Sequence, residues 1–147
     1  MFTDQQGVRS EVSPRVSVIV VTYRSVAEIR DCVESLLEQR VPVEVFLIDN
    51  ASGDKTAEIV SDYAARFQNI HAILNEENIG LAAANNCALG KCKGDYVLIL
   101  NPDTLLRGDA LKCMVDFLDR NPDVGVIGPK NVYAGGVPTV VFTDSGV

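Results

Sequence analysis

The sequence is poor in the residues from which zinc sites are built. It has a single histidine, His71, and none of its four cysteines stands in a Cys-x-x-Cys pair. The cysteines are Cys32, Cys87, Cys92 and Cys113. Structural zinc sites rely on such pairs, so we expect no zinc site. Cysteines spaced in this way are typical of reduced thiols, which indicates a cytosolic protein.

Basic residues are also scarce, with 13 Lys and Arg against 20 Asp and Glu and a formal net charge of −7. Nucleic-acid binding needs a basic face, so we expect no nucleic-acid partner. Any anionic ligand would have to be held locally, by a metal ion or by helix N-termini.

Long hydrophobic runs are absent as well. The longest, at residues 16–21 and 96–100, fall far below the roughly 20 residues of a membrane span, so no transmembrane segment is expected. Residues 1–14 are polar without a signal-peptide core, and we expect a mobile leader there. These features indicate a cytoplasmic protein, at most peripheral to a membrane.

The chain contains no internal repeat, no low-complexity tract and no linker. Its 147 residues match the usual size of a single domain. A domain of this length buries roughly 68–70% of its unfolded surface, which is enough for a core of its own. We therefore treat residues 15–147 as one domain.

Buried β-strands alternate with amphipathic helices along the sequence. Short apolar runs rich in β-branched residues predict strands at 16–21, 43–48, 70–74 and 96–100, and a short fifth strand at 124–127. Helices are predicted from a capping box of Ser25 and Glu28 to about Arg40, after a cap at Asp54, and at 81–92 and 109–120. Such alternation is typical of a three-layer α/β fold, with a mostly parallel sheet and helices on both faces. Residues 137–142 are a further candidate strand.

Polar residues follow each of the first four predicted strands. The candidate binding-site residues at these strand ends are Thr22, Tyr23, Asp49, Asn50, Asn78, Gly80, Asn101 and Asp103. Ligands of open α/β sheets bind at the carboxyl ends of the strands, where these residues would converge. Each one alone could be a turn former or a helix cap. Four polar strand ends on one edge favour a ligand site.

Four motifs in this order resemble the family-2 glycosyltransferases, especially the rhamnosyltransferase-like branch. They are residues 18–23 (VIVVTY), 47–54 (LIDNASGD), 78–86 (NIGLAAANN) and 98–103 (LILNPD). The resemblance covers about residues 16–129. It implies the nucleotide-sugar-binding half of a GT-A fold, an inverting transfer of sugar to an acceptor hydroxyl, and a role in cell-envelope polysaccharide synthesis.

The resemblance also implies roles for the candidate residues. Asp49, followed by Asn50, would accept a hydrogen bond from the nucleobase, most simply from N3–H of uracil or thymine, so a UDP or dTDP donor is favoured over GDP. The alternative for Asp49 is a cap for the loop that follows it. Thr22 and Tyr23 would flank the base or the ribose, or simply end the strand.

The resemblance implies roles for two further motifs as well. Asn78 and Gly80 belong to a loop next to the nucleotide, where Gly80 either contacts the donor or permits a tight turn. Asn101-Pro102-Asp103 stands at the family's metal motif, with asparagine in place of the first acidic residue. Asp103 is then the one carboxylate for Mg²⁺ or Mn²⁺, with Asn101 as a neutral ligand or hydrogen-bond donor.

The same tripeptide recurs at Asn121-Pro122-Asp123, but there it follows a predicted helix. We expect it at the opposite edge of the sheet, as a helix stop without a chemical role.

The resemblance implies that the acceptor site and the general base come later than the matched motifs. Beyond Lys130 the only carboxylate side chain is Asp144, whose surroundings do not resemble the base-bearing segment, so no catalytic residue is identified. We therefore expect a truncated domain without transfer activity of its own, which self-associates through residues 137–142 as a homo-oligomer. The alternative is a non-catalytic nucleotide-binding or interaction module. A phospho-acceptor receiver domain lacks its acidic pair after the first strand, and a dinucleotide-binding domain lacks its G-x-G-x-x-G.

Overall fold

The computed structural model describes residues 13–132, which form one parallel sheet and four helices. The strands are β1 (Val16–Thr22), β2 (Val43–Asp49), β3 (Ile70–Leu74) and β4 (Tyr96–Leu100). They lie in the order β3-β2-β1-β4, and all three pairings are parallel. The helices are α1 (Ile29–Leu37), α2 (Thr56–Arg66), α3 (Leu81–Leu89) and α4 (Ala110–Arg120).

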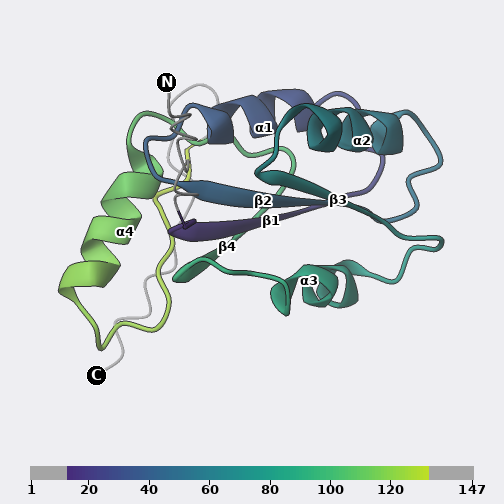
Figure 1. Cartoon of the computed structure of the whole chain (residues 1–147). Helices are drawn as coiled ribbons and strands as arrows, with labels where there is room; N and C mark the ends of the chain where they lie inside the picture. The colour runs from purple at the N-terminus through teal and green to yellow at the C-terminus, as the bar shows by residue number, and fades with distance from the viewer. Residues whose placement is uncertain (1–12, 133–147) are drawn as a thin grey trace, which may run out of the picture.

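The helices cover both faces of the sheet (Figure 1). Because side chains alternate along a strand, Val18 and Val20 of β1 pack with α1 and α2, whereas Ile19 and Val21 pack with Ala84 and Ala88 of α3. The first cluster is the larger one and also contains Leu111 and Val115 of α4. The three-layer α/β architecture expected from the sequence is confirmed.

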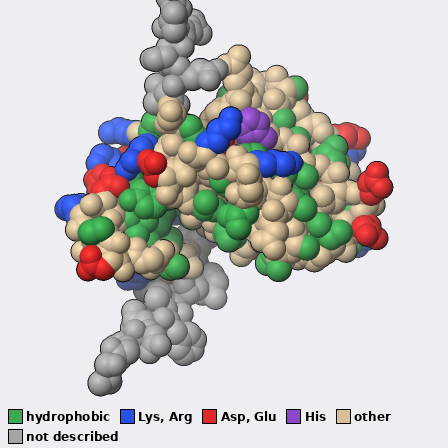
Figure 2. Space-filling model, turned by 60° about the horizontal axis from the view of Figure 1, so that its bottom comes forward, with side chains coloured by type: hydrophobic (Ala, Val, Ile, Leu, Met, Phe, Trp, Pro, Cys, Tyr) green, Lys and Arg blue, Asp and Glu red, His purple; other side chains and the backbone are tan. Residues whose placement is uncertain are grey.

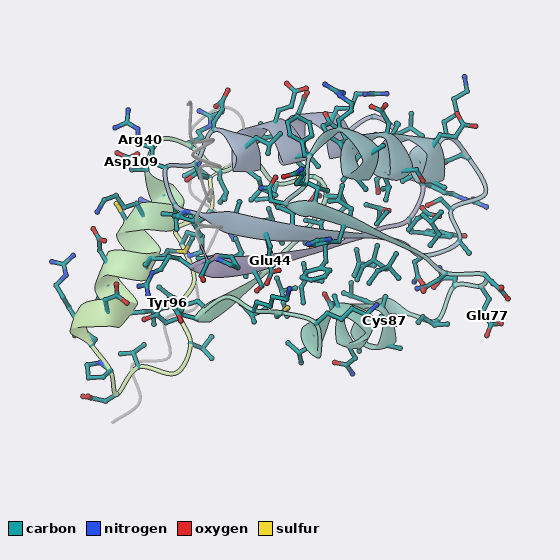
Figure 3. All side chains as sticks on the ribbon, viewed as in Figure 1. Arg40, Glu44, Glu77, Cys87, Tyr96 and Asp109 are labelled. Carbon is teal, nitrogen blue, oxygen red and sulfur yellow. The ribbon has the colours of Figure 1, made fainter. Side chains whose placement is uncertain are left out.

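The helix α4 marks the edge of the sheet where the strands begin, here called the amino edge. Near its end, Asp119 accepts hydrogen bonds from Arg15, which precedes β1, at 2.7 and 2.8 Å, and from the Tyr96 hydroxyl at 2.7 Å. Figure 3 shows Tyr96 beside α4 and Glu77 at the far end of the molecule. Glu77 belongs to the loop after β3, at the edge where strands end, here called the carboxyl edge.

Two predicted elements differ in the structure. The expected fifth strand at 124–127 does not form, and Val126 is 89% exposed. A short apolar run becomes a strand only where a neighbouring strand offers hydrogen bonds, and sequence alone does not show that neighbour. The third helix ends at Leu89 rather than near Cys92, because Lys91 N–H turns back to the carbonyl of Ala88 at 2.8 Å.

The predicted capping box of Ser25 and Glu28 is also wrong. The helix α1 begins at Ile29 without a side-chain cap. The Ser25 hydroxyl donates instead to the carbonyl of Tyr23 at 3.4 Å, and the Ser25 N–H donates to the hydroxyl of Thr56, at 3.0 Å, where α2 begins. A contact between two loops therefore replaces the local cap. Asp54 lies one residue before Lys55, the N-cap of α2, which makes no side-chain cap; Asp54 accepts the N–H of Thr56, the first residue of the helix, at 2.8 Å.

Two expectations concern parts of the chain outside the described residues: the leader, of which residues 1–12 are not described, and the strand at 137–142. Within residues 13–132, no helix is both long and apolar enough to cross a membrane.

Candidate functional site

The site begins where β1 and β4, which are neighbours in the sheet, reach the carboxyl edge. The chain leaves β1 and β2 through helices on one face and enters β4 from α3 on the other face (Figure 1). The point between β1 and β4 is therefore a topological switch point, the usual ligand position in such sheets. A pocket of about 290 Å³ opens there, lined by Tyr23, Arg24, Ser25, Glu28, Asn101, Pro102 and Asp103.

The Asn101-Pro102-Asp103 side of the pocket is a tight turn. The Thr104 N–H donates to the carbonyl of Asn101 at 3.1 Å, so Pro102 and Asp103 occupy the two corner positions. Pro102 suits the first corner because its φ is already fixed near the value that a turn requires. The side chains of Asn101 and Asp103 are exposed. This turn presents an amide and a carboxylate to one pocket.

Tyr23 and Arg24, which follow β1, also line the pocket. Tyr23 is 46% exposed, and the guanidinium carbon of Arg24 lies 5.2 Å from the centre of its ring. Arg24 has a φ of 54°, a left-handed conformation that is uncommon outside glycine. Its N–H donates to the Ser52 hydroxyl at 2.9 Å, which holds this conformation in place. Backbone strain of this kind gathers at binding sites.

Thr22 and Asp49 lie beneath the pocket rather than in its lining. Thr22 is fully buried, and its hydroxyl donates to the carbonyl of Ile48 at 3.0 Å. Asp49 is 3% exposed and accepts hydrogen bonds from the Ser52 hydroxyl and, at 3.1 Å, from the Ser52 N–H. Both carboxylate oxygens therefore organise the loop after β2, as the capping alternative expects.

Asn50 connects the loop after β2 to the loop after β3. Its side-chain oxygen accepts from Asn75 at 3.1 Å and from the Ile79 N–H at 3.2 Å, and its amide donates to Asn78 at 2.8 Å. Asn50 is only 3% exposed. Its polar atoms are thus engaged within the protein, and its structural contribution is to fix residues 75–80.

Gly80 ends this loop and precedes α3. Its φ of 81° and ψ of 162° fall in a region that only glycine adopts readily. A Cβ at this position would meet no atom within 4 Å, so conformation rather than space requires glycine. Asn78 accepts the Gly80 N–H at 3.0 Å and stabilises the turn into the helix.

The structure therefore brings together only part of the predicted site. Tyr23, Asn101 and Asp103 line the pocket. Thr22, Asp49 and Asn50 are buried below it, and Asn78 and Gly80 shape the neighbouring loop. Sequence reasoning missed Arg24 and Glu28, which also line the pocket. Arg24 directly follows Tyr23 at the strand end and could have been found there, whereas Glu28 reaches the pocket only through the fold.

The protein provides few ligands of its own for a metal ion. Within residues 13–132, no three His, Cys, Asp or Glu side chains are grouped closely enough to hold one. Asp103 and Asn101 supply a carboxylate and an amide in one open pocket. That donor set fits Mg²⁺ or Mn²⁺, hard cations that keep several waters and take further oxygens from a phosphate ligand.

A second hollow, of about 420 Å³, lies between α1 and α2. It is lined by Val26, Arg30, Lys55, Glu58, Ile59 and Asp62. Although larger, it lies on the helical face, has charges of both signs, and receives no residue that directly follows a strand. The smaller pocket at the switch point is therefore the candidate site.

Comparison with known proteins places this geometry in a family. Residues 17–142 match the model of Glycosyl transferase family 2. The chain is 37% identical over 131 residues to TuaG of Bacillus subtilis, a protein named for teichuronic acid biosynthesis; the match covers 88% of this chain and 52% of that protein. The chain therefore spans about half the length of this relative.

Two solved structures share the fold and are 32% identical to this chain over the matched residues. Staphylococcus aureus TarS 1–349 in complex with UDP-GlcNAc superposes with a TM-score of 0.66 and 32% identity, over 74% of this chain and 32% of that one. The mannosyltransferase PcManGT of Pyrobaculum calidifontis, with GDP-Man and Mn²⁺, gives a TM-score of 0.66 and 32% identity, over 74% and 33%. The chain belongs to glycosyltransferase family 2.

Proposed function

We propose that this member of glycosyltransferase family 2 forms the donor-binding part of a glycosyltransferase and binds a nucleotide-diphospho-sugar in the pocket between β1 and β4. The observation that carries the proposal is the lining of that pocket at the switch point. Tyr23 and Arg24 come from the end of β1, and Asn101 and Asp103 from the end of β4. These groups suit a sugar nucleotide: an aromatic ring that can stack, a cation, and an amide and a carboxylate that can hold a metal ion.

The diphosphate is the leaving group of an inverting transfer, and it must be stabilised as its negative charge develops. Asp103 and Asn101 would hold Mg²⁺ or Mn²⁺ against the phosphate oxygens, and the ion would neutralise that charge when bound. Arg24 is the cationic side chain that lines the pocket. It would add a hydrogen-bonded positive charge on the opposite side of the diphosphate.

The base would bind next to Asp49. The Asp49 Oδ1 accepts from the Ser52 hydroxyl, and Oδ2 accepts from the Ser52 N–H at 3.1 Å. A carboxylate oxygen accepts two hydrogen bonds, so Oδ2 retains capacity for one donor such as N3–H of uracil or thymine. We therefore propose a UDP or dTDP donor. The solved relatives contain both UDP-GlcNAc and GDP-Man, so the fold alone does not select the base.

The remaining features of the whole protein are proposals as well. TuaG and TarS are named for polymers of the cell envelope, which favours an envelope polysaccharide as acceptor. The resemblance of the four motifs to the rhamnosyltransferase-like branch favours that branch of the family. All four cysteines are free thiols, which supports a cytoplasmic location, including the surface of a membrane. Figure 2 shows patches of hydrophobic side chains on one face of the molecule. Val97 and Ile99 of β4, the last strand of the sheet order, are 43% and 60% exposed, which supports self-association.

A thermal-shift screen tests the proposal. UDP-, dTDP- and GDP-sugars are each added with and without Mn²⁺, and the shift in Tm is measured. A bound donor stabilises the fold by about 2.7 kcal/mol at a hundredfold excess over its Kd. We expect stabilisation by uridine or thymidine donors that increases with Mn²⁺. Absence of stabilisation by every donor at millimolar concentration would refute nucleotide-sugar binding by this domain, and stabilisation without Mn²⁺ dependence would favour a non-catalytic nucleotide-binding module.

A further inference from the structure

Three polar side chains on one side of α1 and just past its end contact the segment that follows β4. They belong to Cys32 and Ser35 in the helix and to Gln39, two residues after the last helical residue. Their spacing of three and four residues keeps them on the same side. The Cys32 thiol donates to the carbonyl of Asn101 at 3.7 Å. Ser35 Oγ accepts the Leu106 N–H at 3.1 Å, and Gln39 Oε1 accepts the Leu111 N–H at 3.2 Å.

The Cys32 contact reaches the turn that presents Asp103. The carbonyl of Asn101 accepts both the Cys32 thiol and the Thr104 N–H that closes the turn. Cys32 is 0% exposed, so water has no access to take the place of the thiol. Any change of this donor therefore acts directly on the turn.

Ser35 and Gln39 extend the contact along the loop. Ser35 Oγ donates to the carbonyl of Cys32 at 2.8 Å, and Gln39 Nε2 donates to the carbonyl of Ser35 at 3.2 Å. Each side chain is thereby held on α1 while it accepts an N–H from the other segment. Leu106 and Leu111, whose N–H groups are bound in this way, are 7% and 2% exposed and anchor the segment in the core.

We propose that Cys32 is a positioning residue for the metal-binding turn, with Ser35 and Gln39 fixing the rest of the loop behind it. Through the Asn101 carbonyl, Cys32 sets the orientation in which Asp103 faces the ion and the diphosphate. The effect on metal binding rests on the proposed function, whereas the effect on the turn concerns the free protein alone. Partners of this kind commonly change metal affinity by about 10–100-fold when they are removed.

The alternative is that Cys32 only packs in the core. Its neighbour Val33 provides a matched control. Both residues are fully buried in the same cluster on α1. No hydrogen bond links the apolar Val33 side chain to the loop. Cys32→Val removes the donor and keeps an apolar side chain, Cys32→Ser keeps a donor, and Val33→Ala loosens the same core without touching the contact.

Two measurements on these variants test the proposal. NMR amide exchange in the free protein follows the Thr104 N–H, and calorimetry gives the ratio of UDP affinities with and without Mn²⁺. We expect Cys32→Val to accelerate Thr104 exchange selectively and to lower the affinity ratio by about tenfold. Cys32→Ser should retain the wild-type values, and Val33→Ala should lower Tm and leave the ratio unchanged.

Equal effects of Cys32→Val and Val33→Ala on Thr104 exchange would overturn the positioning role. So would an unchanged affinity ratio in Cys32→Val. If the wild-type chain bound no UDP at all, the proposed function would fail, and the Thr104 exchange in the free protein would still decide whether Cys32 holds the turn.

Discussion

The two Asn-Pro-Asp tripeptides of this chain form the same turn in two different places. The carbonyl of Asn101 accepts the Thr104 N–H at 3.1 Å, and the carbonyl of Asn121 accepts the Val124 N–H at 3.0 Å. The first turn leaves β4 at the carboxyl edge and lines the pocket with Tyr23 and Arg24. The second follows α4 at the amino edge, where the Asn121 amide donates to the carbonyl of Phe117 at 2.7 Å. Local sequence therefore determines the turn, and the fold determines whether the turn lines the pocket.

The largest effect on sugar-nucleotide binding is expected from removing the carboxylate of the first tripeptide. Asp103→Ala should abolish the Mn²⁺-dependent part of sugar-nucleotide binding, because Asp103 is the carboxylate that the turn presents to the pocket. The loss should exceed the roughly 10–100-fold that outer-shell changes cost. Titration calorimetry with and without Mn²⁺ measures it. Sugar-nucleotide binding that still depends on Mn²⁺ in Asp103→Ala would show that the metal site is not at this turn.

The second prediction concerns Asp49, at the carboxyl edge but below the pocket. Asp49→Asn replaces the charged acceptor of the Ser52 hydrogen bonds, so stability should fall by about 1.5–3 kcal/mol. Nucleotide affinity should fall equally with and without Mn²⁺, because the effect is on the base rather than the diphosphate. Urea unfolding and calorimetry give the two values. Asp54→Asn is the control, since Asp54 accepts the N–H of Thr56 and is exposed. A loss for Asp49→Asn confined to the Mn²⁺ condition would contradict the assignment to the base.

Much of the fold could be predicted from the sequence, because buried strands carry strong local signals. The predicted strands at 70–74 and 96–100 have the observed bounds, and those at 16–21 and 43–48 end one residue early. β-Branched runs are buried on both faces of a parallel sheet, so few alternatives satisfy them. The fifth strand failed because it needs a neighbouring strand that the sequence does not reveal. The Ser25 capping box failed because Ser25 contacts Thr56, a residue elsewhere in the chain, instead of forming the local cap.

The site was less predictable than the fold for the same reason. The strand ends identified which residues gather at the carboxyl edge, but not which side chains face outward. Thr22 and Tyr23 are adjacent, but Thr22 is the last residue of the buried strand β1, whereas Tyr23 lies just after it and is 46% exposed. Glu28 reaches the pocket from the turn before α1, and Cys32 contacts Asn101 across 69 residues of sequence. Such relationships exist only once the sheet has formed.

The third prediction compares two non-glycine residues that have a positive φ, Arg24 and Ala51. Their φ angles are 54° and 58°. Glycine relieves about 1–2 kcal/mol of strain but adds entropy to the unfolded chain, so each Gly variant should be stabilised by about 0.5 kcal/mol. Only Arg24→Gly should weaken sugar-nucleotide binding, because only Arg24 lines the pocket. Urea unfolding and calorimetry test this pair, and equal affinities would show that the Arg24 cation does not contact the donor.

A fourth, smaller effect is expected at the amino edge. The Tyr96 hydroxyl, and then Arg15, lower the pKa of Asp119. A carboxyl with a lowered pKa in the folded state contributes stability above its unfolded pKa, and this contribution is lost as pH falls through the folded value. Asp119→Asn should therefore lower Tm slightly at pH 7 and leave it unchanged in strong acid, with the nucleotide affinity unaffected. A Tm difference that persists below the acid transition would contradict the role of the ionised carboxylate.

The smallest effect is predicted for Asp123→Ala, the counterpart of Asp103→Ala in the second tripeptide. Asp123 is exposed, and the turn around it is closed by the backbone bond from Val124 to Asn121 at 3.0 Å, which alanine leaves in place. Stability should change by no more than about 0.5 kcal/mol, as for most surface substitutions. Nucleotide affinity should not change, because α4 carries the chain to the amino edge, where Asp119 contacts Arg15 and Tyr96. Calorimetry beside Asp103→Ala makes the test quantitative, since both variants remove a carboxylate from the third position of one turn. Equal losses of nucleotide affinity in the two variants would mean that net charge, rather than position at the switch point, governs binding. The pocket between β1 and β4 would then not be the donor site.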